Sequence, residues 1–211
     1  QEPLIIDPTL IVSTFTGSTA NNFGFTATYD AAGNIYTGGT VYALGYPTTA
    51  GAYDLTFDGA TDIGISKFNP SGTALVYSTY YGGANSDQPH SMIVNSSNQL
   101  FVVGRSNSLD FPTMGAYQPA LSGGYDIIVG KFTSTGALSA STYVGGTSDD
   151  GVNYSAGLMG NTKFNYADDG RGEIMLDNAG NVLVSICTQS SDFPAVSAYD
   201  NSLGGLQDAC I

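Results

Sequence analysis

The sequence STYYGG at residues 78–83 recurs as STYVGG at residues 141–146 and, in a weaker form, as STFTG at residues 13–17. The copies begin at positions 13, 78 and 141, so the spacing is 65 residues and then 63. Unrelated segments do not share such a register by chance. A fixed period indicates a repeat architecture, in which the repeated unit determines the fold more than the total length of 211 residues does.

Three further marks follow one another in the same order in every copy. A turn rich in Asp, Asn and Gly occurs at residues 30–34, 95–99 and 177–181. An aromatic-Pro pair, followed by a Tyr, begins at residues 46, 111 and 193. A strand-like run begins with Asp at positions 62, 126 and 208. The common order predicts one structural unit repeated along the chain, with the third copy stopping inside a strand.

Each complete unit contains four short apolar runs separated by turn residues, which predict four strands. In the first unit the runs cover residues 25–29, 35–41, 63–68 and 74–80. Four antiparallel strands make one blade of a β-propeller, in which blades pack side by side because a single sheet cannot cover both of its faces. We therefore expect an all-β fold, a β-propeller of four-stranded antiparallel blades that is incomplete in this chain. A β-helix or another solenoid is the alternative.

The repeat marks divide the chain into four expected segments of one propeller domain. Residues 1–20 are the leading strand of a preceding blade, 21–83 and 84–146 are blades, and 147–211 are a partial blade. An insertion at residues 151–171 lengthens that last segment. Propellers close with four or more blades, so we expect a fragment whose partners include the remaining blades of a parent chain.

The charge balance excludes two classes of partner. Five Lys and Arg residues stand against eighteen Asp and Glu, which gives a net charge of −13. A chain with this charge repels nucleic-acid phosphates and anionic membrane surfaces, so we expect no nucleic-acid binding. No apolar run approaches the roughly 20 residues of a spanning helix, so direct membrane insertion is not expected. The start at Gln1, without an apolar leader, indicates a removed signal peptide or an excised piece.

An oxygen-bearing side chain recurs at two positions of each unit. The turns begin at three aligned residues, Asp30, Asn95 and Asp177. Eight residues before them stand Asn22, Asp87 and Asp169. We interpret both sets as acceptors for backbone N–H groups in turns and at the junctions between blades. Lys67 and Lys131 also share a position, which suggests surface pairs with Asp62 and Asp126 or solvated stems.

Calcium is the one cofactor that the residues suggest. Asp149, Asp150, Asp168 and Asp169 bracket the insertion, and carboxylate oxygens suit this ion. However, neither an EF-hand loop nor another calcium-binding repeat is present, so we expect no cofactor and keep calcium as the alternative.

Catalytic residues are not expected. His90 is the only histidine, no Gly-x-Ser-x-Gly elbow accompanies it, and the only glutamates are Glu2 and Glu173. We predict that the chain is not an enzyme.

The two cysteines, Cys187 and Cys210, fall at the end of the second strand and the start of the third strand of the last unit. An antiparallel pairing brings these strand ends together, so a disulfide is geometrically reasonable. Two buried free thiols are the alternative.

Together the repeat mark, the turn DAAGN at residues 30–34, the loop YPTTAGAY at 46–53 and the run from Asp62 through KFNPSG resemble the SBBP family of β-propeller repeats. The resemblance covers residues 10–211. It implies a large secreted or cell-surface protein, notably of Bacteroidetes, in which a C-terminal sorting domain of the gliding-motility type directs export by the type IX system.

These observations lead to one preferred function and two alternatives. We expect a non-catalytic, extracellular or cell-surface module, associated with the outer membrane, that binds a protein or polysaccharide in adhesion or gliding motility. A passive structural spacer in a large surface protein is the alternative, and a hydrolase is less favoured.

Overall fold

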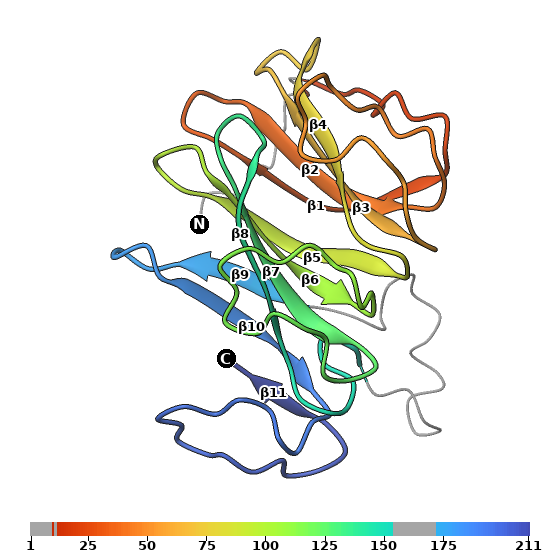
Figure 1. The fold of residues 1–211 in the computed structure, drawn as a ribbon. Coiled ribbons are helices and arrows are strands. Elements are labelled where there is room, and N and C mark those ends of the chain that lie inside the picture. Colours follow the sequence, from red (N-terminus) through yellow and green to blue (C-terminus); the bar gives the residue numbers. More distant parts are fainter. Residues whose placement is uncertain (1–9, 11, 154–171) are drawn as a thin grey trace, which may run out of the picture.

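The computed structural model describes residues 10, 12–153 and 172–211, and these residues form strands, turns and loops but no helix (Figure 1). The first sheet has the order β1 (Asn22–Tyr29), β2 (Ile35–Val41), β3 (Asp62–Phe68) and β4 (Leu75–Tyr81). The second has the order β5 (Asp87–Val94), β6 (Leu100–Ser106), β7 (Asp126–Phe132) and β8 (Leu138–Val144). The third contains β9 (Glu173–Leu176), β10 (Val182–Thr188) and β11 (Asp208–Cys210).

The all-β class and the four-stranded antiparallel sheets expected from the sequence are confirmed. Within each sheet every strand pairs with the next strand along the chain, so each sheet is a simple meander. The three sheets lie within the expected segments 21–83, 84–146 and 147–211. The described residues before β1 form no strand, so they do not supply the leading strand expected within 1–20. In the described part of the chain, no helix is long and apolar enough to cross a membrane.

A side-chain oxygen closes the turn between the first two strands of each sheet. The Asp30 carboxylate accepts from the backbone N–H of Asn34 at 2.9 Å, and the Asn95 amide oxygen accepts from that of Gln99 at the same distance. Asp177 accepts in the same way from the N–H of Asn181 at 2.8 Å. These three residues therefore act as the turn acceptors that their repeated position predicts.

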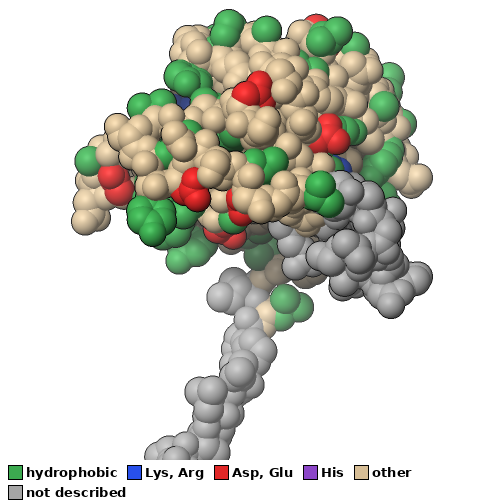
Figure 2. Space-filling view, turned by 90° about the horizontal axis from the view of Figure 1, so that it is seen from below, with side chains coloured by type: hydrophobic (Ala, Val, Ile, Leu, Met, Phe, Trp, Pro, Cys, Tyr) green, Lys and Arg blue, Asp and Glu red, His purple; other side chains and the backbone are tan. Residues whose placement is uncertain are grey.

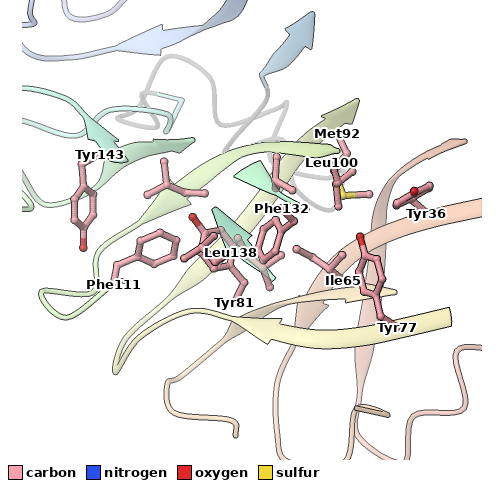
Figure 3. Close-up of a cluster of buried hydrophobic side chains, with 13 residues drawn as sticks. Tyr36, Ile65, Tyr77, Tyr81, Met92, Leu100, Phe111, Phe132, Leu138 and Tyr143 are labelled. Carbon is pink, nitrogen blue, oxygen red and sulfur yellow. The ribbon is translucent and has the colours of Figure 1, made fainter. Parts of the chain in front are cut away.

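Two hydrophobic clusters hold the sheets together. The cluster in Figure 3 joins the first and second sheets, and the ring of Tyr81 lies at its centre, 4.7 Å from the ring of Phe111 and 5.0 Å from that of Phe132. A second cluster joins the second and third sheets through Phe101 and Ile186. The second sheet is thus packed on both faces, as in the view of Figure 1.

The strand β6 shows how one strand serves both clusters. Leu100 and Val102 belong to the first cluster, whereas Phe101 and Val103 belong to the second. Successive side chains of a strand point to opposite faces, so the continuous apolar run is the sequence signature of a sheet buried on both sides.

We predict that Ile128→Ala lowers the free energy of unfolding by about 2–4 kcal/mol, because Ile128 is fully buried between the first and second sheets and truncation leaves a cavity. Urea denaturation measures the loss. The matched control is Val76→Ala on the outer strand β4, where the side chain is 50% exposed and the loss should stay below about 1 kcal/mol. Equal losses in the two variants would contradict this packing.

Candidate functional site

A buried polar structure that occurs twice lies at the junctions between consecutive sheets. Asp87 begins the first strand of the second sheet, and its Oδ2 accepts from the N–H of Gly83 at 2.8 Å and from the hydroxyl of Ser108 at 2.9 Å. Both carboxylate and hydroxyl are buried. The carboxylate therefore ties the Gly-Gly turn that precedes the sheet to the loop that leaves its second strand.

Asp150 forms the same junction between the second and third sheets. Its Oδ2 accepts from the N–H of Gly146 at 2.7 Å and from Ser190 Oγ at 2.8 Å, and the hydroxyl of Thr188 donates to its Oδ1. Asp150 is thus the structural counterpart of Asp87. This corrects the alignment that assigned the position to Asp169, because the insertion follows the junction carboxylate and does not precede it.

At the third equivalent position, before β1, an amide replaces the carboxylate. Asn22 Nδ2 donates to the carbonyl oxygen of Ala20 at 3.1 Å. Asp87 accepts from a backbone N–H as its position predicts, whereas Asn22 donates to a backbone carbonyl and differs from the prediction. Asp169 lies outside the described residues.

A second carboxylate supports each acidic junction. Asp110 Oδ1 accepts from the N–H of Ala84 at 2.8 Å, and Asp192 Oδ1 accepts from the N–H of Thr147 at 2.9 Å. Both residues directly precede the aromatic-Pro pair of their unit. The aromatic-Pro loop is therefore attached to the junction at each of these two places.

The third strand of each complete sheet brings another buried carboxylate to the junction. Asp126 accepts from the N–H groups of Ser122 at 2.8 Å and Gly123 at 3.1 Å, and from Gln118 Nε2 at 2.7 Å. These three donors satisfy most of its acceptor sites, so Asp126 closes the end of its loop.

Asp62 occupies the same position in the first sheet with fewer donors. Its Oδ2 accepts from the N–H of Asp58 at 3.1 Å, while its Oδ1 is buried and has no hydrogen-bond partner. The chain has Asp54 at the position that Gln118 occupies in the second unit, so a negative charge replaces an amide donor. Asp62 is therefore the least satisfied carboxylate of the two junctions.

Glycine makes room for the carboxylates to converge. A Cβ atom on Gly82 would lie 2.6 Å from Asp62 Oδ1 and 3.0 Å from Asp87 Oδ2. On Gly145 it would lie 2.6 Å from Asp126 Oδ1. Real Cβ atoms do not approach polar atoms so closely, which gives the Gly-Gly mark a physical reason.

Burial raises the pKa of four carboxyl groups at the junctions, those of Asp62, Asp87, Asp126 and Asp150. Desolvation is the main cause for Asp62, whose pKa rises to about 7, and the charge of Asp87 adds to the effect. Desolvation also raises the pKa of Asp87 to about 6, against the opposing effect of hydrogen bonds from Ser106, Gly83 and Ser108. The pKa values of Asp126 and Asp150 rise for the same main reason.

The four proposed calcium ligands are not brought together in the described part of the chain. Asp150 is committed to the junction, Asp149 Oδ1 accepts from the N–H of Tyr125 at 3.1 Å, and Asp168 and Asp169 lie outside the description. No group of three or more His, Cys, Asp or Glu side chains among the described residues could hold a metal ion.

The cysteines are free thiols, so the disulfide considered from the sequence is not formed. Cys187 lies opposite Ala209 and Cys210 lies opposite Ile186. Opposed residues share a face of the sheet and successive residues alternate, so the two thiols point to opposite faces. The strand ends do meet as expected, but a one-residue offset in register separates the sulfur atoms.

The repeated lysines do not pair with Asp62 or Asp126. Lys67 is buried, and its Nζ lies 3.3 Å from Asp30 Oδ2 and 4.8 Å from the centre of the Tyr36 ring. Lys131 Nζ lies 5.2 Å from the centre of the Phe101 ring. Each lysine therefore covers an aromatic residue of the neighbouring strand.

Sequence reasoning missed Asp150 as a junction residue, together with Ser108 and Ser190. A signal was present: Gly-Gly is followed by Asp four residues after its second Gly, both at residues 82–87 and at 145–150. The insertion lies between Asp150 and the turn at Asp177, so the distance from the turn to the junction residue is longer in the third unit.

The loops between the second and third strands present exposed side chains at fixed places. Leu44 and Leu109 precede the aromatic-Pro pairs of the first two units and are 73% and 80% exposed. The Phe111 ring, two residues after Leu109, is buried in the first cluster. Tyr46 takes the place of Phe111 in the first unit, and its backbone N–H donates to the hydroxyl of Tyr80 at 2.9 Å. Each leucine is thus exposed on a loop that is anchored within two residues.

No protein-family model matches the sequence, and a search of curated proteins finds no match.

We predict that the free energy of unfolding falls as the pH rises from 5 to 8, by about 1–3 kcal/mol. Asp62 has a folded-state pKa of about 7, above its value in the unfolded chain, so the folded state binds the proton more tightly and loses this advantage as the pH rises. Asp62→Asn should flatten the dependence in urea denaturation at several pH values.

The control for this pH effect is Asp177→Asn. Asparagine can take this place, because Asn95 accepts the same turn hydrogen bond in the second unit. Hydrogen bonds from Asn181 lower the pKa of Asp177, so its substitution should leave the loss of stability between pH 5 and 8 in place. An unchanged slope in Asp62→Asn would contradict the assignment.

We predict two reactive thiols per chain by thiol titration in denaturant without a reductant. In the native protein both should react slowly, because burial raises the pKa of Cys187 and raises that of Cys210 to about 12. Cys187→Ser should leave one thiol. Thiols that emerge only after reduction would show that a disulfide forms.

Proposed function

We propose that the chain is a set of blades from a β-propeller that serves as a non-catalytic binding module. The three sheets follow one another in a single stack (Figure 1). The first strand of one sheet contacts the first strand of the next, β1 with β5 and β5 with β9. The same carboxylate junction joins the sheets twice. Both features support radial packing of blades more than the alternative of a β-helix, whose coils stack along one axis.

The observation that carries the binding role is the pair Leu44 and Leu109. Single exposed apolar residues are common on protein surfaces and need no explanation. These two occupy the same position of successive units on anchored loops, so they can be buried by a partner without ordering a flexible segment. Leucine buries well against apolar side chains but lacks the flat ring that stacks on sugars, which favours a protein partner over a polysaccharide.

The charge of the surface narrows the partner further. Figure 2 shows acidic side chains among hydrophobic ones and very few basic ones on the visible face. With a net charge of −13, the chain favours a partner that is neutral or basic where it docks.

The resemblance to SBBP repeats supports a place outside the cell, at the surface of a Bacteroidetes-type bacterium, with export by the type IX system and a role in adhesion or gliding. The carboxylates at the junctions are buried and bonded within the fold, which supports a structural use over catalysis. Calcium is not part of this proposal.

We predict that beads coated with the chain adhere to intact cells of a Bacteroidetes species. Treatment of the cells with protease should abolish adhesion to a protein partner. The variant Leu44→Ser/Leu109→Ser should reduce adhesion by about tenfold or more, since burial of one leucine side chain is worth about 1.5–3 kcal/mol and about 1.4 kcal/mol corresponds to a factor of ten. Bead counts by microscopy or flow cytometry measure the effect.

The matched control is Val76→Ser, which changes a half-exposed apolar residue on β4 away from the loops. It should retain adhesion. Absence of adhesion by the unmodified chain would support the alternative of a passive spacer, and adhesion that survives protease treatment would indicate a polysaccharide.

A further inference from the structure

A buried lysine contacts a buried carboxylate in the first sheet. Lys67 lies on β3, and its Nζ is 3.3 Å from Oδ2 of Asp30, which begins the turn between β1 and β2. The side chains of these two residues are 6% and 0% exposed. Burial removes the hydration of both charges, so a pair of this kind is weak evidence for a role in stability alone.

An amide group on the same turn completes the arrangement. Asn34 Nδ2 donates to Asp30 Oδ2 at 2.8 Å and to Oδ1 at 3.1 Å. Oδ2 of Asp30 thus contacts both the amine nitrogen of Lys67 and the amide nitrogen of Asn34. A carboxylate that contacts an attacking nitrogen and a leaving nitrogen is placed to carry protons from one to the other.

The strand register holds the amine and the amide near each other. Lys67 lies opposite Tyr36 in the pairing of β3 with β2. Asn34 stands two residues before Tyr36. Residues two apart along a strand share a face, and diagonal neighbours on that face are within reach of a long side chain.

Aromatic side chains surround the three groups. The Tyr36 hydroxyl donates to Asp30 Oδ2 at 3.1 Å, and Lys67 Nζ lies 4.8 Å from the centre of the Tyr36 ring. Tyr36 and Tyr77 are both buried, with their ring centres 6.3 Å apart (Figure 3). Exclusion of water from such a site prevents hydrolysis from competing with attack by the amine.

We propose that Lys67 and Asn34 form an intramolecular isopeptide bond, with Asp30 as the catalytic carboxylate. Nζ of Lys67 attacks Cγ of Asn34, and the bond between Cγ and Nδ2 breaks. The ammonium group of Lys67 gives up two protons through Asp30, and Nδ2 takes up both and leaves as an ammonium ion. The products are one amide bond and one ammonium ion, so charge is conserved and no other reactant is needed.

The ionised state of Asp30 suits this role. Burial opposes ionisation, but hydrogen bonds from Asn34, Tyr36 and Lys67 hold the pKa of Asp30 below its usual value. A carboxylate with a low pKa is a weak base, so we expect a slow reaction. A slow reaction is sufficient because it occurs once in each molecule, between groups that the fold holds in place.

The second sheet provides an internal comparison. Lys131 lies opposite Phe101 on β7, at the place that Lys67 has on β3. The turn of this sheet has Asn95 and Gln99 at the positions of the aspartate and the asparagine, and Asn95 Nδ2 donates to Gln99 Oε1 at 2.9 Å. No carboxylate stands at either position, so we expect no bond at Lys131.

The bond would join β2 to β3 across residues 42–61, the longest connection within the first sheet. A covalent link across a loop stabilises a fold by restricting the unfolded chain. Neither Leu44 nor Leu109 takes part in it. Bond formation and adhesion are therefore measured independently, and failure of one leaves the other unaffected.

The test is mass spectrometry of the full 211-residue chain after incubation of the folded protein at neutral pH. Proteolysis should release a branched peptide that joins residue 34 to residue 67 and is lighter by one ammonia than its two parts together. Cyclisation of Gln1 also releases ammonia, so the branched peptide identifies the bond. Its absence after prolonged incubation would overturn the proposal.

Two variants separate the reaction from the fold. Asp30→Asn should fold, because Asn95 accepts the corresponding turn hydrogen bond in the second sheet, and circular dichroism checks this. The yield of branched peptide at early times should fall about a hundredfold or more, since a positioned proton carrier contributes about 10²–10⁴ in rate. Lys67→Arg should give no branched peptide. An undiminished yield in Asp30→Asn, or an equal product at Lys131, would contradict the role of the carboxylate.

Discussion

The structure depends on the requirement that the second sheet bury both of its faces. An amphipathic sheet can leave one face in water, but every residue of β6 is buried, and its side chains supply apolar groups alternately to the sheets on either side. Such a sheet is stable only between two others. Packing of successive sheets, with the outer strand of each leading into the first strand of the next, follows from this constraint.

The carboxylate junctions make that packing specific at an electrostatic cost. Asp62 and Asp87 lose hydration as the sheets close, and their mutual repulsion adds to the loss. Backbone N–H groups and serine hydroxyls offset the cost at Asp87 and Asp150, and each bond connects a turn of one sheet to a loop of the next. Hydrophobic contact alone would tolerate sliding between sheets, whereas these bonds form in one relative position only.

Sequence and structure agree where a feature depends on local pattern and differ where it depends on side-chain direction. Alternating apolar residues and turn acceptors located the strands well, although β1 begins at Asn22, three residues before the predicted start. The disulfide considered for Cys187 and Cys210 does not form, because a disulfide requires two cysteines on the same face of the sheet. The strand register determines the face on which each cysteine lies. Lys67 reaches Asp30 in a neighbouring turn and not the Asp62 of its own strand, a choice that no local pattern encodes.

The weaker form of the repeat mark has a physical explanation in these terms. Gly82 and Gly83 are required because Asp62, Asp87 and Asp110 crowd the space that their side chains would fill. Before the first sheet, Asn22 stands at the position of Asp87, and Gly45 stands at the position of Asp110. Neither carboxylate is therefore present at that place. A Cβ atom on Gly17 would meet nothing within 4 Å, and Ser18 replaces the second glycine without a clash. The second glycine of the mark and the carboxylates of a junction therefore occur together in these copies, while the first glycine is kept at Gly17, where φ is +82°.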